Sequence, residues 1–288
     1  MVSVFDSMTD IRNTLPPDFD LISGKAGAVI GLLILRNILD DASLLDFAEQ
    51  LGNELIQSAD KAGLTYSWKA PTILNQRNLT GLSHGTAGVG YALLELYRAT
   101  GNSIYKKSAE FAFQYERHFF DAEAGNWPDF RKELGSSNKR KHSLNFATSW
   151  CHGAPGIAMS RLRAYEILKD STYKAEAIVA LQTTRKMIET SIQSGTENYS
   201  LCHGLSGNAE ALLYGTQVLG QEWLEGFAVS CKIGNIGIDT YAKHNRPWPC
   251  GTYNGQTPNL MLGLAGIGYY YLRLHNSAVP SILLLRGV

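Results

Sequence analysis

Leu201-Cys-His-Gly-Leu-Ser-Gly-Asn-Ala-Glu-Ala-Leu-Leu-Tyr214 joins a Gly-x-x-Gly step to an apolar, helix-like run. Four more steps of this form are Gly24-Lys-Ala-Gly27, Gly85-Thr-Ala-Gly88, Gly153-Ala-Pro-Gly156 and Gly263-Leu-Ala-Gly266. The first glycines of consecutive steps are 61, 68, 51 and 59 residues apart. This period is typical of one helical hairpin with its loops, whose apolar faces are buried by stacking on neighbouring copies. The sequence therefore predicts an all-α fold of helical hairpins, with an inner helix starting at each of the five glycine steps.

Each predicted hairpin contains an inner and an outer helix. Runs such as Tyr91–Tyr97 and Ala209–Tyr214 follow glycine steps, and Tyr105–Tyr115 has the pattern of an intervening helix. Glycines three residues apart lie on one helix face, where a neighbouring backbone can approach closely. Glycine can also serve helix packing alone, but the shared arrangement of the steps favours a repeat.

Composition limits the fold and excludes some functions. The chain has 288 residues, 44% of them apolar, and a formal net charge of zero. This length suits a single domain over residues 1–288, which we expect, or two domains. The zero net charge argues against a general nucleic-acid or membrane-surface binder, because both need a basic excess.

The apolar runs and the amino-terminal sequence bear on location. The longest apolar run, Ala26–Ile34, is too short to cross a bilayer, so no integral membrane segment is expected. The first residues lack the basic and apolar order of a signal peptide. Together these features predict a cytoplasmic protein.

Three longer stretches lack a helical pattern: 63–80, 121–149 and 240–261. We expect them to form loops over one end of the helical scaffold. The middle stretch contains Lys139-Arg-Lys-His142, which is either a solvated loop or a dock for an acidic peptide segment.

The chain contains four cysteines. In a reducing compartment we expect thiols or metal ligands rather than disulfides. Cys231 and Cys250 lie outside the repeat register and are expected to be structural or incidental. The other two cysteines directly precede histidines and lie within the register.

These two Cys-His pairs predict a metal site. Cys151 and Cys202 occupy the same offset before successive glycine steps, so we expect them to be neighbours in space. His203 can supply a third ligand, and two thiolates with an imidazole are a common zinc set. His152 could complete a closed, structural site; without it, the site would be open and suited to catalysis.

Two further residues approach a glycine step in the same way. His84 shares the offset of His152 and His203, and an imidazole that faces the same opening as the ligands can act as an acid or a base. Asp20 lies four residues before Gly24, in the matching approach to the first copy. On its own, Asp20 would be interpreted as a helix cap.

At these residues the chain resembles the lanthionine synthetase C-like cyclases. The motifs that carry the resemblance are Asp20-Leu-Ile-Ser-Gly-Lys-Ala-Gly27, Gly81-Leu-Ser-His-Gly-Thr-Ala-Gly88, Trp150-Cys-His-Gly-Ala-Pro-Gly156 and Leu201-Cys-His-Gly-Leu-Ser-Gly207. The tail, Leu260–Tyr269 followed by Val279–Leu285, is most similar to the carboxyl end of the bifunctional class II enzymes. The resemblance runs across nearly the whole chain.

The resemblance implies an α/α toroid with one zinc ion at its centre. The implied ligands are Cys151, Cys202 and His203, and a fourth position would be left for water or a substrate thiol, because His152 falls where family members vary. His84 and Asp20 match the acid-base residues of the family. The implied reaction is zinc-dependent thioether cyclisation: a cysteine of a dehydrated precursor peptide with a leader adds to dehydroalanine or dehydrobutyrine and forms lanthionine or methyllanthionine.

The chain also departs from the family pattern. Complete members have more hairpins, so the resemblance implies that about two are missing from the amino end, together with the class II dehydratase domain. A dehydratase domain or chain could supply the missing part.

Three alternatives to peptide cyclisation remain. Glutathione addition to dehydroamino acids in proteins is suggested by animal relatives. A truncated, inactive zinc- or peptide-binding scaffold would keep the motifs without turnover. A glycosidase would need two carboxylates, and Asp20 has no partner carboxylate at a repeat-equivalent position.

Overall fold

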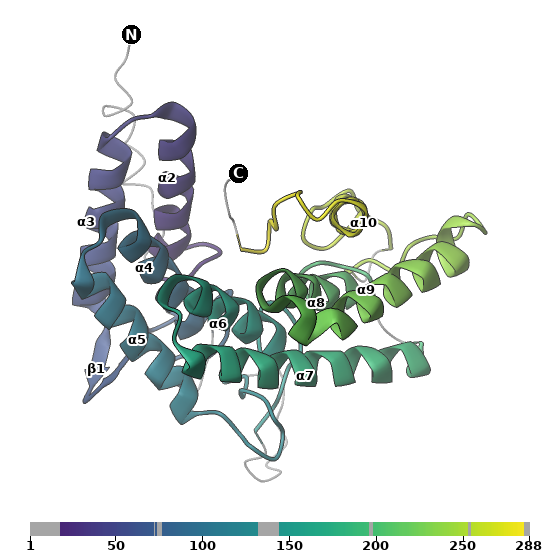
Figure 1. The fold of residues 1–288 in the computed structure, drawn as a ribbon, viewed down its shortest axis with the longest axis horizontal. Coiled ribbons are helices and arrows are strands. Elements are labelled where there is room, and N and C mark those ends of the chain that lie inside the picture. Colours follow the sequence, from purple (N-terminus) through teal and green to yellow (C-terminus); the bar gives the residue numbers. More distant parts are fainter. Residues whose placement is uncertain are drawn as a thin grey trace. The chain divides into compact units, whose positions relative to one another are not determined.

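The computed structural model of the protein describes residues 18–71, 73, 77–131, 144–195, 198–252 and 255–284. Helices dominate these residues (Figure 1), and one short antiparallel hairpin pairs Asp60–Ala62 (β1) with Thr65–Ser67 (β2). The α-helices are Lys25–Leu39 (α2), Ser43–Ser58 (α3), Thr86–Thr100 (α4), Ser103–His118 (α5), Ala154–Leu168 (α6), Ser171–Ser194 (α7), Leu205–Leu219 (α8), Leu224–Gly237 (α9) and Leu264–His275 (α10). A 3-10 turn, Gly220–Trp223, precedes α9, and a π turn, Ile238–Ala242, follows it.

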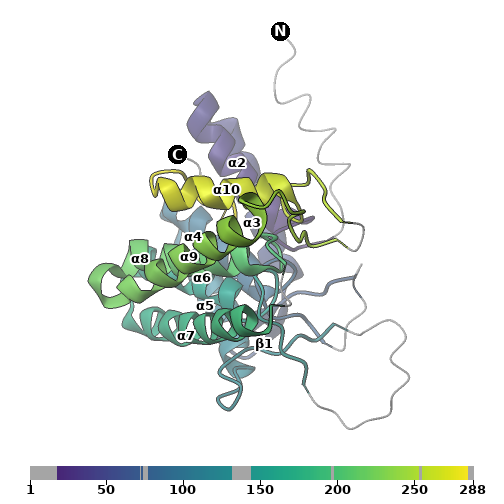
Figure 2. The same ribbon diagram turned by 90° about the vertical axis from the view of Figure 1, so that its right-hand side faces the viewer.

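The chain divides into two compact units. The described residues of the first lie within 18–119, 129–131 and 144–145, and its helices are α2 to α5. The described residues of the second lie within 120–128 and 146–284, and its helices are α6 to α10. Within the first unit α2 packs against both α3 and α4; within the second, α8 packs against α6, α7, α9 and α10 (Figure 2). The single domain over 1–288 stays a prediction.

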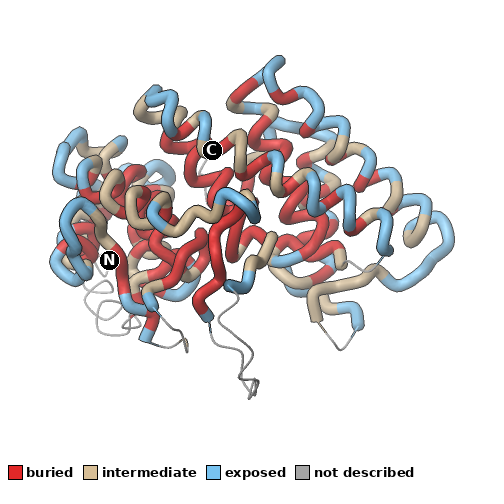
Figure 3. The backbone as a smooth tube through the Cα atoms, turned by 90° about the horizontal axis from the view of Figure 1, so that it is seen from below, coloured by how far each residue is buried: buried red, intermediate tan, exposed pale blue. Residues whose placement is uncertain are grey.

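Inner and outer helices differ in burial. Every residue of Thr86–Leu96 in α4, Ala154–Ala164 in α6 and Leu205–Gly215 in α8 is buried. The outer helix α5 instead buries one stripe that includes Tyr105, Ala109 and Phe113. A helix that is buried all round is a core element, whereas a single apolar stripe marks a helix at the surface. Figure 3 shows the corresponding long buried stretches, flanked by exposed helix ends.

The five glycine steps start five helices. The first glycine of every step directly precedes α2, α4, α6, α8 or α10. The predicted inner runs lie in α4 and α8, and the predicted outer run, Tyr105–Tyr115, lies in α5. The prediction of an all-α fold with helical hairpins is therefore confirmed.

The backbone that approaches these glycines is that of the preceding loop, rather than that of a neighbouring helix. In four of the steps, a Cβ on the second glycine would lie 1.8–2.2 Å from the carbonyl oxygen of the residue six positions earlier. For Gly207 that oxygen belongs to Leu201, and the distance would be 1.8 Å. Each loop thus folds back onto the first turn of its own helix, which brings the residues just before the glycine step to the helix amino end.

The expected loops are found in part. Residues 65–67 of the first stretch form β2, and isolated bridges join Asp121 to Asn126 and Asp129 to Asn145 in the second. The basic run Lys139–His142 lies outside the described residues. Among the residues that the structure describes, no helix is both long and apolar enough to cross a membrane.

Candidate functional site

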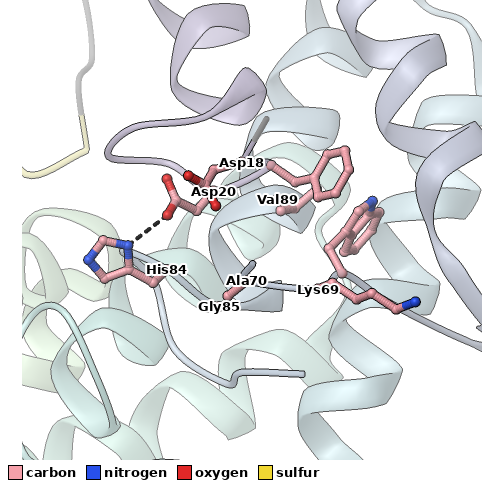
Figure 4. Close-up of a pocket in the computed structure, with 9 residues that line it drawn as sticks. Asp18, Asp20, Lys69, Ala70, His84, Gly85 and Val89 are labelled. Atoms are coloured by element: carbon pink, nitrogen blue, oxygen red, sulfur yellow. Dashed lines mark hydrogen bonds and ion pairs between the residues drawn. The ribbon is translucent and has the colours of Figure 1, made fainter. Parts of the chain in front are cut away.

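The structure brings Asp20 and His84 into direct contact in the first unit. Oδ2 of Asp20 lies 2.7 Å from Nδ1 of His84 (Figure 4). The Asp20 side chain is 7% exposed and that of His84 is 27% exposed. Because an ionised carboxylate can only accept, the contact places the proton on Nδ1 of His84. In the neutral imidazole, Nε2 is then the nitrogen that can accept a proton from a ligand.

Asp20 is held by its own turn as well as by His84. Its Oδ1 accepts hydrogen bonds from the backbone N–H of Ile22 (3.1 Å) and of Ser23 (2.7 Å). Burial by itself would raise the pKa of the Asp20 carboxyl, but the hydrogen bonds from His84 and Ser23 outweigh it and hold the pKa below its ordinary value. Asp20 is therefore ionised at neutral pH, and it does not cap α2, which begins after Gly24.

The two loops that carry this pair are joined through their backbones. The N–H of Leu21 donates to the carbonyl oxygen of Ser83 at 3.0 Å. Beside the pair lies a small pocket whose wall includes Asp18, Lys69 and Val89 (Figure 4). Asp20 and His84 line the same pocket, so their contact borders a hollow of the first unit.

Cys151 lies in the turn before α6 in the second unit. Its Sγ is half-buried and lies 3.2 Å from Oγ of Ser149. Gly153 adopts φ +87° at the end of this turn, and a Cβ there would lie 1.9 Å from the carbonyl oxygen of Ala147. The neighbouring His152 is only 1% exposed, so its imidazole has different surroundings from the Cys151 thiol.

Cys202 and His203 lie in the equivalent turn before α8. The N–H of Cys202 donates to the carbonyl oxygen of Met261 at 2.9 Å, which fixes the turn against the segment before α10. Cys202 is half-buried and His203 is exposed. A Cβ on Gly251 would lie 2.8 Å from Nε2 of His203, so a side chain at position 251 would crowd that nitrogen.

The two cysteine turns lie at the same end of adjacent helices. Nδ2 of Asn208, in the first turn of α8, donates to the carbonyl oxygen of Thr148 at 3.0 Å. Two thiols and an imidazole are chemically suited to zinc. In the described ranges, however, no three His, Cys, Asp or Glu side chains are grouped so that they could hold a metal ion. The ligand set Cys151, Cys202 and His203 therefore stays a prediction.

The two cysteines outside the register are also half-buried. Burial raises the pKa of the Cys231 thiol above its ordinary value, which favours the neutral form. This agrees with a structural role for Cys231. Cys250 directly precedes Gly251, and Gly251 lies next to the His203 imidazole.

Two buried polar residues that hold the site loops were not predicted. Glu116 accepts from the backbone on both sides of His84, and Oδ1 of Asn126 accepts from the N–H of Ala154 at the start of α6. Glu116 has a sequence signal, because it continues the apolar stripe of α5 at helical spacing. Asn126 lies in a loop and has none.

The chain matches the family model described as "Lanthionine synthetase C-like protein" over residues 5–284. It is similar to the lacticin 481/lactococcin biosynthesis protein LcnDR2 of Lactococcus lactis subsp. lactis, with 26% identity over 90% of this chain and 26% of that protein. It is also similar to the nisin biosynthesis protein NisC of the same organism, with 29% identity over 70% of this chain and 50% of that protein. The chain thus spans between a quarter and a half of the length of these curated relatives.

One animal relative and one solved structure complete the comparison. Glutathione S-transferase LANCL1 of Danio rerio is 22% identical over 68% of this chain and 46% of that protein. A nisin cyclase structure has a TM-score of 0.64 and 20% identity, and the match covers 98% of this chain and 70% of the other. At this identity the likeness concerns the fold, and it confirms the expected fold class.

Proposed function

Because the chain belongs to the lanthionine synthetase C-like family, we propose that it catalyses thioether ring closure in a dehydrated peptide. The observation that carries the proposal is the hydrogen bond between Asp20 and His84, which prepares an imidazole for proton transfer beside a pocket. The equivalent turns that present Cys151 and Cys202 before α6 and α8 support it.

The acid-base pair is proposed to handle the protons of the addition. The substrate thiolate forms a bond to the β-carbon of dehydroalanine or dehydrobutyrine, and the π electrons move to give an enolate. His84, protonated on Nε2, donates that proton to the α-carbon. Asp20 accepts the hydrogen bond from Nδ1 throughout and stabilises the imidazolium form. The proton released by the substrate thiol restores the protonated imidazole.

Cys151, Cys202 and His203 are proposed to hold a zinc ion. Bound by two thiolates and an imidazole, zinc would lower the pKa of a substrate thiol so that thiolate is available near neutral pH. The burial of His152 supports an open site with three protein ligands rather than a closed one. The exposed His203 can rotate toward a metal without leaving a buried cavity.

The proposed substrate is a precursor peptide with a leader, dehydrated elsewhere. A dehydratase domain or a separate dehydratase chain would supply this peptide. A cytoplasmic location would keep the thiols of this chain and of the peptide reduced. Glutathione addition is a second candidate because LANCL1 carries the name of a glutathione S-transferase. An inactive peptide-binding scaffold is the third.

The test combines zinc content with ring closure. We expect about one zinc per chain in protein purified without chelator, and loss of zinc and ring closure together in Cys202→Ala. Cys231→Ala is the matched control, because this thiol lies on α9 outside the register. His84→Asn should keep zinc while slowing ring closure at least a hundredfold, by the usual contribution of a general acid.

The substrates distinguish the alternatives. Ring closure is tested with a dehydrated Cys-containing peptide, whose loss of free thiol is followed by alkylation and mass spectrometry. Glutathione addition is tested with a dehydrated peptide that lacks Cys, incubated with glutathione. An inactive scaffold would bind the peptide without consuming thiol. Stoichiometric zinc in Cys202→Ala would overturn the ligand assignment.

A further inference from the structure

A buried carboxylate lies beneath the loop that carries His84. Glu116, in the last turn of α5, is 0% exposed. Its Oε1 accepts hydrogen bonds from the backbone N–H of Ala87 at 2.7 Å and of Gly81 at 3.1 Å. Gly81 precedes His84 and Ala87 follows it, so a single carboxylate binds the backbone on both sides of the imidazole-bearing residue.

The contact with Ala87 also completes the start of α4. Gly85 precedes the first residue of α4 and has no side chain with which to cap it. The first N–H groups of a helix have no partner within the helix, and a negative charge near them is favoured by the helix dipole. Glu116 supplies both the acceptor and the charge from the neighbouring helix.

The register of α5 shows that apolar packing alone does not explain a carboxylate here. Tyr105, Ala109, Ala112 and Phe113 form the stripe that Glu116 continues. An apolar residue at 116 would extend this stripe, whereas a buried charge is costly unless it is hydrogen-bonded. The same apolar residue would leave the N–H groups of Gly81 and Ala87 unsatisfied, so the carboxylate is suited to fixing this loop.

The fixed loop is also the one that meets Asp20. The carbonyl oxygen of Ser83 accepts from the N–H of Leu21, and the adjacent His84 imidazole contacts the Asp20 carboxylate. A shift of the loop at either end would therefore change the geometry of the imidazole against its partner. We propose that Glu116 is a positioning residue that acts through His84. This inference rests on the proposed function only for its kinetic consequence.

The structural test uses protein labelled with ¹⁵N-histidine, and it needs no substrate. The His84 resonances are identified by their loss in His84→Asn. In Glu116→Ala we expect the His84 ring to lose its fixed Nδ1–H tautomer and its signals to shift, with Glu116→Gln intermediate because an amide oxygen still accepts. Glu95→Gln is the matched control: Glu95 is also buried in the first unit, but its carboxylate accepts from Arg98 on the same helix.

The kinetic test is a double-mutant comparison. Glu116→Gln should lower kcat for ring closure roughly tenfold or more, with little change in KM or in zinc per chain. In the His84→Asn background the same substitution should have no further effect on kcat, because Glu116 influences the reaction only through the His84 imidazole. Equal losses in both backgrounds would overturn the inference.

The two readouts separate this inference from the proposed function. Unchanged His84 signals in folded Glu116→Ala, or in Glu116→Gln where the alanine variant does not fold, would overturn the positioning role even if the wild type closes rings. If the Glu116 substitutions shift the His84 signals but the wild type closes no rings, the positioning role is upheld and the cyclase proposal is rejected.

Discussion

Individual side chains set the chemistry of the Asp20–His84 pair. The carboxylate accepts two backbone N–H groups from its own turn and one imidazole N–H, and the bonds from His84 and Ser23 outweigh the effect of burial on its pKa. The sequence predicted both residues as site residues from their positions before the glycine steps. They are 64 positions apart in the sequence, and their contact depends on the two loops that carry them meeting at Leu21 and Ser83.

The depressed pKa of Asp20 predicts an acid-dependent stability contribution. The ordinary pKa is 3.8 and the folded value is lower, so the ionised carboxylate stabilises the fold above about pH 3.8, and this stabilisation is lost as the pH falls through the folded value. We expect Asp20→Asn to be less stable than the wild type near neutral pH and the difference to shrink at strongly acidic pH. Urea unfolding at a series of pH values measures it. A difference that does not vary with pH would contradict the role of the carboxylate charge.

At the scale of helices, the glycine steps do more than start each inner helix. Gly207 allows the carbonyl oxygen of Leu201 to lie against the first turn of α8, which carries Cys202 and His203 to the helix amino end. Gly88 does the same for His84 before α4, and before α6 it is Gly153 that lies against the carbonyl oxygen of Ala147 in the turn that carries Cys151. The repeat therefore places the candidate site residues just before the amino ends of the inner helices.

Two helical glycines should respond oppositely to alanine. In Gly207→Ala the new methyl group would lie 1.8 Å from the Leu201 carbonyl oxygen, so we expect a loss of about 1–3 kcal/mol in the free energy of unfolding, as for other overpacked sites. In Gly31→Ala, within α2, no atom from outside the neighbouring residues and backbone of its own helix lies within 4 Å of the new methyl group, and the better helix propensity should give a gain of about 0.5–1 kcal/mol. Denaturant unfolding of both variants checks this. A neutral Gly207→Ala would show that the loop is free to move.

At the largest scale, contacts between distant parts of the sequence close the second unit. The indole N–H of Trp150, next to Cys151, donates to the carbonyl oxygen of Leu283 at 3.1 Å, across 133 residues of sequence. Leu283 and Leu284 are both 0% exposed. Arg273 on α10 pairs with the buried Glu210 of α8 at 2.6 Å, so α8 and the carboxyl-terminal segment share one buried network with Ser281.

Removing the carboxyl-terminal segment should therefore disturb the Cys151 turn. We expect deletion of residues 279–288 to lower the melting temperature, because it removes the buried Leu283 and Leu284 and the carbonyl oxygen that accepts a hydrogen bond from Trp150. It should also weaken zinc retention against a chelator. Trp150→Phe, which removes only the N–H donor, should cost about 1 kcal/mol. Unchanged melting and zinc retention in the deletion variant would show that this segment is dispensable.

The sequence by itself determined the helical repeat and the inner helix starts, because periodic glycines and apolar runs are local patterns that fix where helices begin. It predicted the candidate site residues from the same register, and their roles stay predictions. Only the tertiary structure decided which residues hold the loops. Glu116 and Asn126 reach backbone groups 35 and 28 residues away, and Trp150 reaches the far end of the chain. Such contacts form when buried polar groups must find partners inside a packed core. Helical spacing places Glu116 on the buried face of α5, but no local pattern specifies which backbone groups it will reach.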